Sequence, residues 1–154
     1  MIERKSAEFV NEIVNHPSIH PWISGPIEGP LDLTGLIEDG SYIPLMGEFG
    51  GFMFWRLSGG VYDAHSAVLP EGRGKWTKEA AIEALHWMFE KEGAKEIMMA
   101  APKGNLAVLI LIRSLKAKFR GRIENGWHLK GQYVPSEIYS LTKADFEKCL
   151  SQYH

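Results

Sequence analysis

Cysteine is nearly absent from this chain of 154 residues. Cys149 is the only one, so no intrachain disulfide can form, and a metal site built from several thiolates is excluded. His16 and His20 are four residues apart, but Pro17 lies between them and no third ligand type clusters nearby, so we expect no metal site. A fold that does without disulfides fits a reducing compartment, and we expect a cytoplasmic protein.

Long apolar runs are also lacking. The longest uninterrupted apolar segment covers residues 106–112, which is far shorter than the roughly 20 residues of a membrane-spanning helix. No apolar stretch of the signal-peptide type follows Met1. We therefore expect a soluble, unprocessed protein that does not enter a membrane.

An excess of charge of one sign is missing as well. Seventeen Lys and Arg residues stand against 19 Asp and Glu residues, which gives a formal net charge of -2, and the pI is near 6.3. Because general nucleic-acid binding needs a surplus of positive charge, we expect none here.

What is present suffices for one hydrophobic core. Hydrophobic residues make up 45% of the chain and charged residues 23%, and we expect a single domain over residues 1–154.

Apolar periodicity and turn residues predict that helices alternate with strands. Ser6, Asn105 and Thr142 are the expected helix N-caps. By period alone, residues 106–112 suit a buried strand as well as a buried helix, and Asn105 decides for the helix. The expected helices cover residues 7–14, 31–37, 76–92, 106–116 and 143–150, with an irregular connection over residues 16–30. The expected strands cover residues 42–46, 51–57, 61–69, 96–101, 118–124, 127–130 and 132–141, with turns at Asn125–Gly126 and Gly131.

The order of these elements predicts the fold class. Three strands in succession form an antiparallel meander, and the strand, helix, strand sequence over residues 61–101 predicts a right-handed crossover with parallel pairing. We expect an α/β fold with a mixed, mostly antiparallel central sheet flanked by helices on both faces.

The segment Val61–Glu92 runs from a strand through the turn Pro70–Lys75 into an amphipathic helix. This geometry aims backbone N–H groups and a helix N-terminus at the space over the turn, which suits a phosphate. Alternate side chains of a strand share a face, so Asp63 and His65 are expected to be neighbours.

LPEGRGK at residues 69–75 enters a helix, and PKGNLA follows at residues 102–107. Together with two further segments, these motifs resemble the GNAT acyltransferase superfamily. Residues 120–141 look like the last hairpin of the subgroup that contains the ribosomal-protein N-acetyltransferases. NHPSI at residues 15–19 is similar to the Asn-Asp-Pro-Glu-Val opening of that subgroup.

The resemblance implies an acyl-CoA N-acyltransferase-like fold, in which the sheet splays open after the third strand of the meander, and acetyl-CoA as co-substrate. The pantetheine arm would lie beside Ala67, Val68 and Leu69 and contact Asn105. Main-chain N–H groups, the helix dipole and the charges of Arg73 and Lys75 would hold the pyrophosphate. The residues implied for this loop are Arg73, Gly74, Lys75, Trp76, Thr77 and Lys78.

Three positions depart from the family pattern. Trp76 and Lys78 stand where the loop has glycine or alanine, and the Trp76 ring would pack either on the adenine or, as we favour, in the core. The tyrosine that usually acts as general acid would fall at Ile112, and no tyrosine lies between Asn105 and Phe119.

Acetyl transfer also needs a base, and Asp63 and His65 are the candidates. Asp63 would orient or stabilise a charged His65. The alternative is a solvent-exposed pair without a catalytic role. Glu48 and Glu137 are weaker candidates.

Two classes of function are consistent with these residues. The first is an N-acetyltransferase that acts on a protein amine or a small-molecule amine, with Asp63 or His65 as base. The second is a catalytically inactive GNAT-like binding or structural protein, as among bacteriophage-encoded GNAT-like proteins that serve as head or virion-assembly factors. The loops Pro17–Gly40 and Asn125–Gly131 would select the acceptor, and exposed aromatics such as Trp127 and Tyr133 would support a homodimer.

Overall fold

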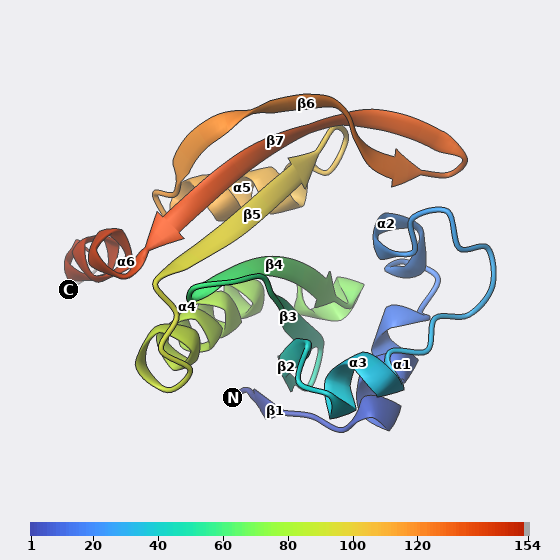
Figure 1. Cartoon of the computed structure of the whole chain (residues 1–154), viewed down its shortest axis with the longest axis horizontal. Helices are drawn as coiled ribbons and strands as arrows, with labels where there is room; N and C mark the ends of the chain where they lie inside the picture. The colour runs from blue at the N-terminus through green and yellow to red at the C-terminus, as the bar shows by residue number, and fades with distance from the viewer. Residues whose placement is uncertain (153–154) are drawn as a thin grey trace.

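Seven strands form one sheet in the computed structural model, which describes residues 1–152 (Figure 1). The spatial order is β1-β2-β3-β4-β5-β7-β6. Only β4 and β5 pair in parallel, and the other neighbours are antiparallel, so the mixed sheet predicted from the sequence is confirmed. The strands are β1 Glu3–Arg4, β2 Tyr42–Gly47, β3 Gly50–Arg56, β4 Val61–Val68, β5 Glu96–Pro102, β6 Lys118–Leu129 and β7 Gln132–Thr142.

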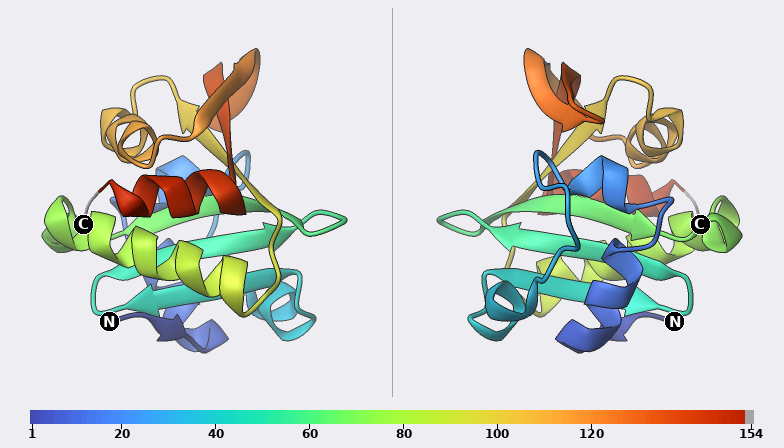
Figure 2. Two further views of the ribbon diagram at one scale, coloured as in Figure 1. Left: turned by 90° about the vertical axis from the view of Figure 1, so that its left-hand side faces the viewer. Right: turned by 90° about the vertical axis from the view of Figure 1, so that its right-hand side faces the viewer.

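Helices cover both faces of the sheet, as predicted (Figure 2). Helices α4, α5 and α6 pack on one face, and α1 and α3 pack on the other. No helix among residues 1–152 is long and apolar enough to cross a membrane. The helices are α1 Ala7–Val14, α2 His20–Ile23, α3 Thr34–Glu38, α4 Lys75–Glu90, α5 Leu106–Ser114 and α6 Lys143–Ser151, and a 3-10 turn spans Pro70–Gly72.

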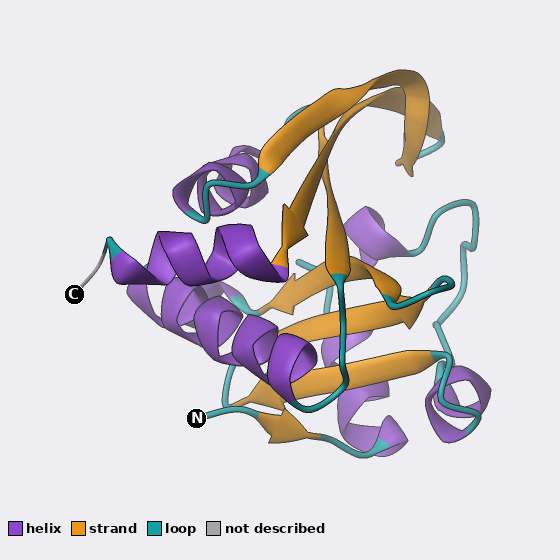
Figure 3. Ribbon diagram, turned by 60° about the vertical axis from the view of Figure 1, so that its left-hand side comes forward, coloured by secondary structure: helices purple, strands orange, loops and turns teal. Residues whose placement is uncertain are grey.

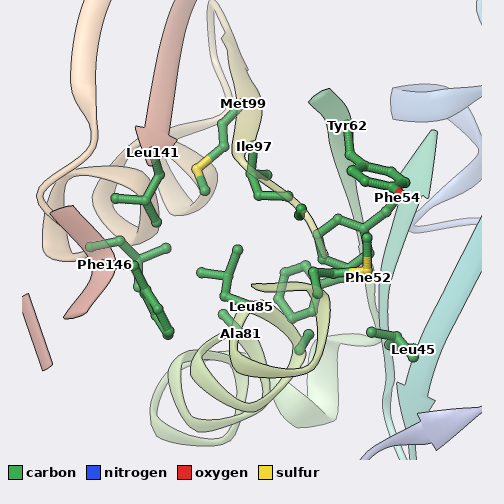
Figure 4. Packing of buried hydrophobic residues seen from close by; sticks show 14 of the residues in the cluster. Leu45, Phe52, Phe54, Tyr62, Ala81, Leu85, Ile97, Met99, Leu141 and Phe146 are labelled. Atoms are coloured by element: carbon green, nitrogen blue, oxygen red, sulfur yellow. The ribbon is translucent and has the colours of Figure 1, made fainter. Parts of the chain in front are cut away.

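The larger of two apolar cores lies between the sheet and α4, α5 and α6 (Figure 4). Phe54 of β3, Leu85 of α4 and Phe146 of α6 are each at most 3% exposed. The rings of Phe89 and Phe146 lie 5.4 Å apart, which joins α4 to α6. Burying one large apolar side chain contributes about 1.5–3 kcal/mol, so this cluster holds the helices on the sheet.

Three helices begin at the N-caps expected from the sequence. The side-chain oxygens of Ser6, Asn105 and Thr142 accept hydrogen bonds from backbone N–H groups three residues further on, at 3.2–3.3 Å. Each bond satisfies one of the N–H groups that lack a partner within the helix, which contributes about 1 kcal/mol.

The sheet opens between β4 and β5. Their pairing covers only Val61–Ala64 against Glu96–Met99. Beyond these residues β4 stays with β3, whereas β5 follows β7, and the two strands diverge into a V (Figures 1 and 3). The opening implied by the family resemblance is therefore present.

The terminal hairpin differs from the prediction. Asn125 and Gly126 do not form a turn, because β6 continues through them as a single strand with a shift of register between Ile123 and Trp127. The chain reverses at Lys130 and Gly131, both of which have positive φ, as a tight hairpin turn requires. The supposed turn is thus an irregularity within the ladder, where three residues of β6 stand opposite one residue of β7.

Candidate functional site

A groove of about 770 Å³ lies over the V between β4 and β5. Its walls come from the end of β4, the first turn of α4 and one side of α5. The predicted residues that line it are Val68, Arg73, Gly74, Lys75, Thr77, Lys78 and Asn105.

The α4 end of the groove is positively polarised. Gly74 precedes α4 with φ 101°, and no side chain caps the helix. The N–H groups of Lys75 and Thr77 lie in the first turn and have no acceptor within the helix. Arg73, Lys75 and Lys78 add positive charge around them, and the dipole of the 16-residue helix adds to it. This end of the groove is suited to an anion.

Trp76 turns its ring away from this groove. The ring contacts Phe49 edge-on, with centroids 5.2 Å apart, and packs against the larger core. A side chain at Gly72 would clash with both rings, so the turn needs glycine there. Of the two alternatives for the Trp76 side chain, core packing is the one observed. Only the backbone N–H group of Trp76, in the first turn of α4, can therefore face a ligand in the groove.

The opposite wall of the groove is apolar. Leu106 and Ile110 of α5 line it and are 66% and 59% exposed. Large apolar side chains exposed on one helix face often mark a binding surface. Asn105 stands at the start of this wall, and its Oδ1 already accepts from the N–H group of Val108. Its amide NH₂ group therefore remains to donate to a ligand.

The end of β4 contributes side chains and backbone differently. Ser66 and Val68 line the groove. Ala67 is 1% exposed in the smaller core, and Leu69 packs against the same core on the opposite face of the sheet. Past Ala64, the edge of β4 that faces β5 has no strand partner, so its backbone is open to an extended ligand. Ala67 can contribute to the groove only through this backbone.

On the other face of β4, Asp63 and His65 are neighbours, as predicted. The His65 Nε2 and Asp63 Oδ2 atoms are 3.2 Å apart, and the side chains are 23% and 36% exposed, respectively. Tyr42 Oη lies 3.3 Å from His65 Nδ1. In the neutral tautomer that donates from Nε2 to Asp63, Nδ1 is the basic atom and accepts from Tyr42. Burial, reinforced by the negative charge of Asp63, raises the pKa of Tyr42, which keeps it a hydrogen-bond donor.

The two loops expected to select an acceptor, residues 17–40 and 125–131, meet beside His65. The indole Nε1 of Trp127 donates to the carbonyl oxygen of Trp22 at 2.8 Å. The His65 ring faces Trp127 edge-on at 6.4 Å. His65, Trp22 and Trp127 all line a smaller cavity in the gap between β4 and β5, whereas Asp63 does not.

This position of Trp127 corrects one expectation. Its ring is half-buried and hydrogen-bonded, so it is not an exposed aromatic available to a second copy of the chain. Tyr133, the other aromatic named for this role, is 63% exposed, and the homodimer stays a prediction.

No tyrosine lines the groove among residues 1–152. Ile112, at the position where the resemblance would put one, is 4% exposed and packs in the larger core. The hydroxyl of Tyr139 donates to Glu137 Oε2 at 2.6 Å, in a place that lines neither the groove nor the gap. Glu48 and Glu137, the weaker base candidates, line neither space either.

No protein-family model and no curated protein sequence matches this chain. Solved structures match it over nearly its whole length. Spermidine N-acetyltransferase from Vibrio cholerae, solved with CoA and spermine, superposes with a TM-score of 0.78 and 12% identity, over 96% of this chain and 97% of its own. The chain has the GNAT acetyltransferase fold.

Two further structures with the GNAT fold illustrate its spread. Mycobacterium smegmatis RimJ in complex with CoA-disulfide gives a TM-score of 0.76 at 13% identity, covering 99% of this chain and 88% of its own. The ribosomal-protein-S5-alanine acetyltransferase from Vibrio fischeri gives 0.74 at 14% identity, covering 94% and 93%. At these identities the likeness establishes the GNAT fold and not the substrate.

Proposed function

We propose that the protein is an N-acetyltransferase that transfers an acetyl group from acetyl-CoA to an amine. The observation that carries the proposal is the groove, which joins a positively polarised helix N-terminus to an apolar wall and ends at the gap between β4 and β5. CoA has the same sequence of chemistry, with phosphates at one end, a long neutral arm and a reactive thioester. Two of the structures with this fold were solved with CoA or its disulfide.

In this proposal the residues at the start of α4 bind the pyrophosphate. The N–H groups of Lys75, Trp76 and Thr77 donate to it, and Arg73 and Lys78 supply charge. Because Trp76 packs on Phe49, its side chain does not obstruct the approach of the phosphates. A lysine at position 78 likewise faces the groove and favours an anion.

The neutral arm then follows α5 and the open edge of β4. Leu106 and Ile110 cover its apolar atoms, and the NH₂ group of Asn105 donates to one of its amide oxygens. This route brings the thioester to the gap between β4 and β5, which is lined by both Ser66 and His65.

The acceptor amine approaches from the His65 side. Its nitrogen attacks the thioester carbonyl carbon, the C–N bond forms, the C–S bond breaks and CoA leaves as a thiolate. His65 takes the amine proton at Nδ1, directly or through the hydroxyl of Tyr42, and Asp63 stabilises the imidazolium that forms.

No tyrosine is needed to protonate the leaving group in this scheme. A thiol with an ordinary pKa near 8.5 leaves readily as a thiolate and takes its proton from water. The first N–H groups of α5, after Asn105, lie along the groove where it meets the gap, and the positive end of this helix stabilises the departing charge.

A catalytically inactive GNAT-like protein is the second candidate, and one observation favours it. Ile112 supplies no proton, and no tyrosine lines the groove of residues 1–152. Such a protein would use the groove for binding or assembly without turnover.

Calorimetry and thiol release test the proposal in sequence. At a hundred times its dissociation constant, acetyl-CoA should stabilise the folded protein by about 2.7 kcal/mol. Free CoA should then appear with amines such as spermidine or a peptide with a free N-terminus. Absence of binding would end the enzyme proposal, and binding without thiol release from any amine would favour the inactive alternative.

A further inference from the structure

The smaller cavity in the gap between β4 and β5, described above, opens from the groove. It has a volume of about 70 Å³ and extends behind β4 toward the larger core. The cavity and the groove are continuous, because both are lined by Trp22, Ser66, Asn105, Val108 and Leu111. A group attached to a thioester in the gap can therefore enter this inner cavity.

The inner end of the cavity is apolar. Its walls are the side chains of Phe52, Phe54, Leu85, Met99 and Ile112, with Ala64 of β4 at the side. A water molecule needs about 10–15 Å³ of such space and two to four polar partners. The cavity is several times larger than this, but its inner walls offer no hydrogen bonds, so an apolar occupant is favoured over water.

Two residues create this space. Ala64 has the smallest side chain that can stand on β4 at the point where β5 departs. Ile112 occupies the position where the family resemblance would put a tyrosine, and its aliphatic side chain leaves the wall without a hydroxyl group. The loss of the usual acid and the presence of an apolar cavity are thus one feature.

We infer that this cavity receives the acyl chain of the donor, and that the protein accepts short acyl-CoA thioesters longer than acetyl-CoA, such as propionyl-CoA and butyryl-CoA. The inference rests on the proposed function. The reaction is unchanged: the amine nitrogen bonds to the acyl carbonyl carbon, the C–S bond breaks, CoA takes up a proton and the amine loses one. His65 and Trp127 line this cavity too, but His65 points to the opposite face of β4 from Ala64, so an acceptor that enters beside His65 approaches the gap from the other face of the sheet. The titrations below contain no acceptor, so they report on the acyl chain alone.

The decisive measurement is calorimetry of the wild-type protein with CoA, acetyl-CoA, propionyl-CoA, butyryl-CoA and octanoyl-CoA, with no acceptor present. Each methylene that enters an apolar cavity should tighten binding about fourfold, so butyryl-CoA should bind about fifteenfold tighter than acetyl-CoA. Octanoyl-CoA should bind more weakly than butyryl-CoA, because the cavity of about 70 Å³ is too small for its chain.

Failure of this inference differs from failure of the proposed function. If acetyl-CoA binds as tightly as or more tightly than the longer thioesters, the cavity does not receive the acyl chain, although the protein still binds acetyl-CoA. If neither CoA nor any thioester binds, the proposed function itself is wrong.

A cavity-filling variant sharpens the test. Ala64→Val places two further methyl groups at the cavity wall, on a strand that tolerates β-branched residues. It should abolish the preference for butyryl-CoA over acetyl-CoA and leave the affinity for CoA within about twofold. Ala117→Val is the matched control, since Ala117 packs against the same core without lining either space. An unchanged preference in Ala64→Val would overturn the assignment, and the wild-type series alone decides the matter if that variant does not fold.

Discussion

His65 and Asp63 stand side by side on one face of β4, with the Nε2 and Oδ2 atoms 3.2 Å apart. Only His65 of this pair lines the gap between β4 and β5, so the two residues have different positions relative to a reacting amine. His65 is placed to take a proton, and Asp63 is placed to orient the ring and stabilise its charge.

Substitution of either residue should therefore reduce turnover without weakening cofactor binding. His65→Ala removes the base, and kcat should fall by about 10²-fold or more. Asp63→Asn should cost less, because the base remains and only its orientation and charge stabilisation are lost. His86→Ala, at an exposed position on α4, is the matched control and should change nothing. Equal kcat values for all these proteins, measured by thiol release, would remove both residues from the mechanism.

The positive end of the groove should control acetyl-CoA affinity through charge. Arg73→Ala and Lys75→Ala should each weaken binding about twofold to fivefold, because exposed charges near a helix N-terminus contribute about 0.3–1 kcal/mol. Added salt should reduce these differences by screening. Lys91→Ala, at the other end of α4, is the control and should leave affinity unchanged. Titration at low and high salt checks the prediction, and a loss in Lys91→Ala equal to that in Arg73→Ala would contradict it.

Asn105 combines a structural role with a binding role, and two variants separate them. Asn105→Ala removes the N-cap of α5 and the free NH₂ group, so it should lower the free energy of unfolding by about 1 kcal/mol and also weaken acetyl-CoA binding. Asn105→Asp keeps a good N-cap but loses the donor. It should retain stability in urea and lose affinity by about tenfold, since an unpaired polar group on the ligand costs about 1–3 kcal/mol. Full affinity in Asn105→Asp would rule out the donor role.

The elements with strong local signals were predictable from the sequence. Ser6, Asn105 and Thr142 begin helices as expected, because a capping residue before an apolar pattern acts over a few residues only. The prediction of a turn at Asn125–Gly126 was wrong because it relied on a local signal alone. The pair is typical of a turn, but pairing with β7 on both sides keeps β6 continuous. Tertiary context overrides a local preference there.

The anion end of the site was also predictable, since the turn and the start of α4 are adjacent in the sequence. The contact of Trp22 with Trp127 was not, because it joins residues 105 positions apart. The contact of Tyr42 with His65 depends on the register of three strands, which no spacing within one strand reveals. Contacts of this kind follow from packing rather than from a pattern along the chain.

Tyr42 should make stability depend on pH in the alkaline range. Burial and the negative charge of Asp63 raise its pKa above the ordinary value of 10. The folded state therefore holds the Tyr42 proton more tightly than the unfolded state does. The stability due to this difference is complete below pH 10 and is lost as the pH rises from there through the folded-state pKa.

In Tyr42→Phe, the free energy of unfolding should fall less steeply above pH 10 than in the wild-type protein. Tyr133→Phe is the matched control, because that side chain is 63% exposed and its loss should leave the slope unchanged. Urea unfolding between pH 8 and pH 11 gives the slopes, and parallel curves for Tyr42→Phe and the wild type would show that the environment of Tyr42 does not favour its protonated form.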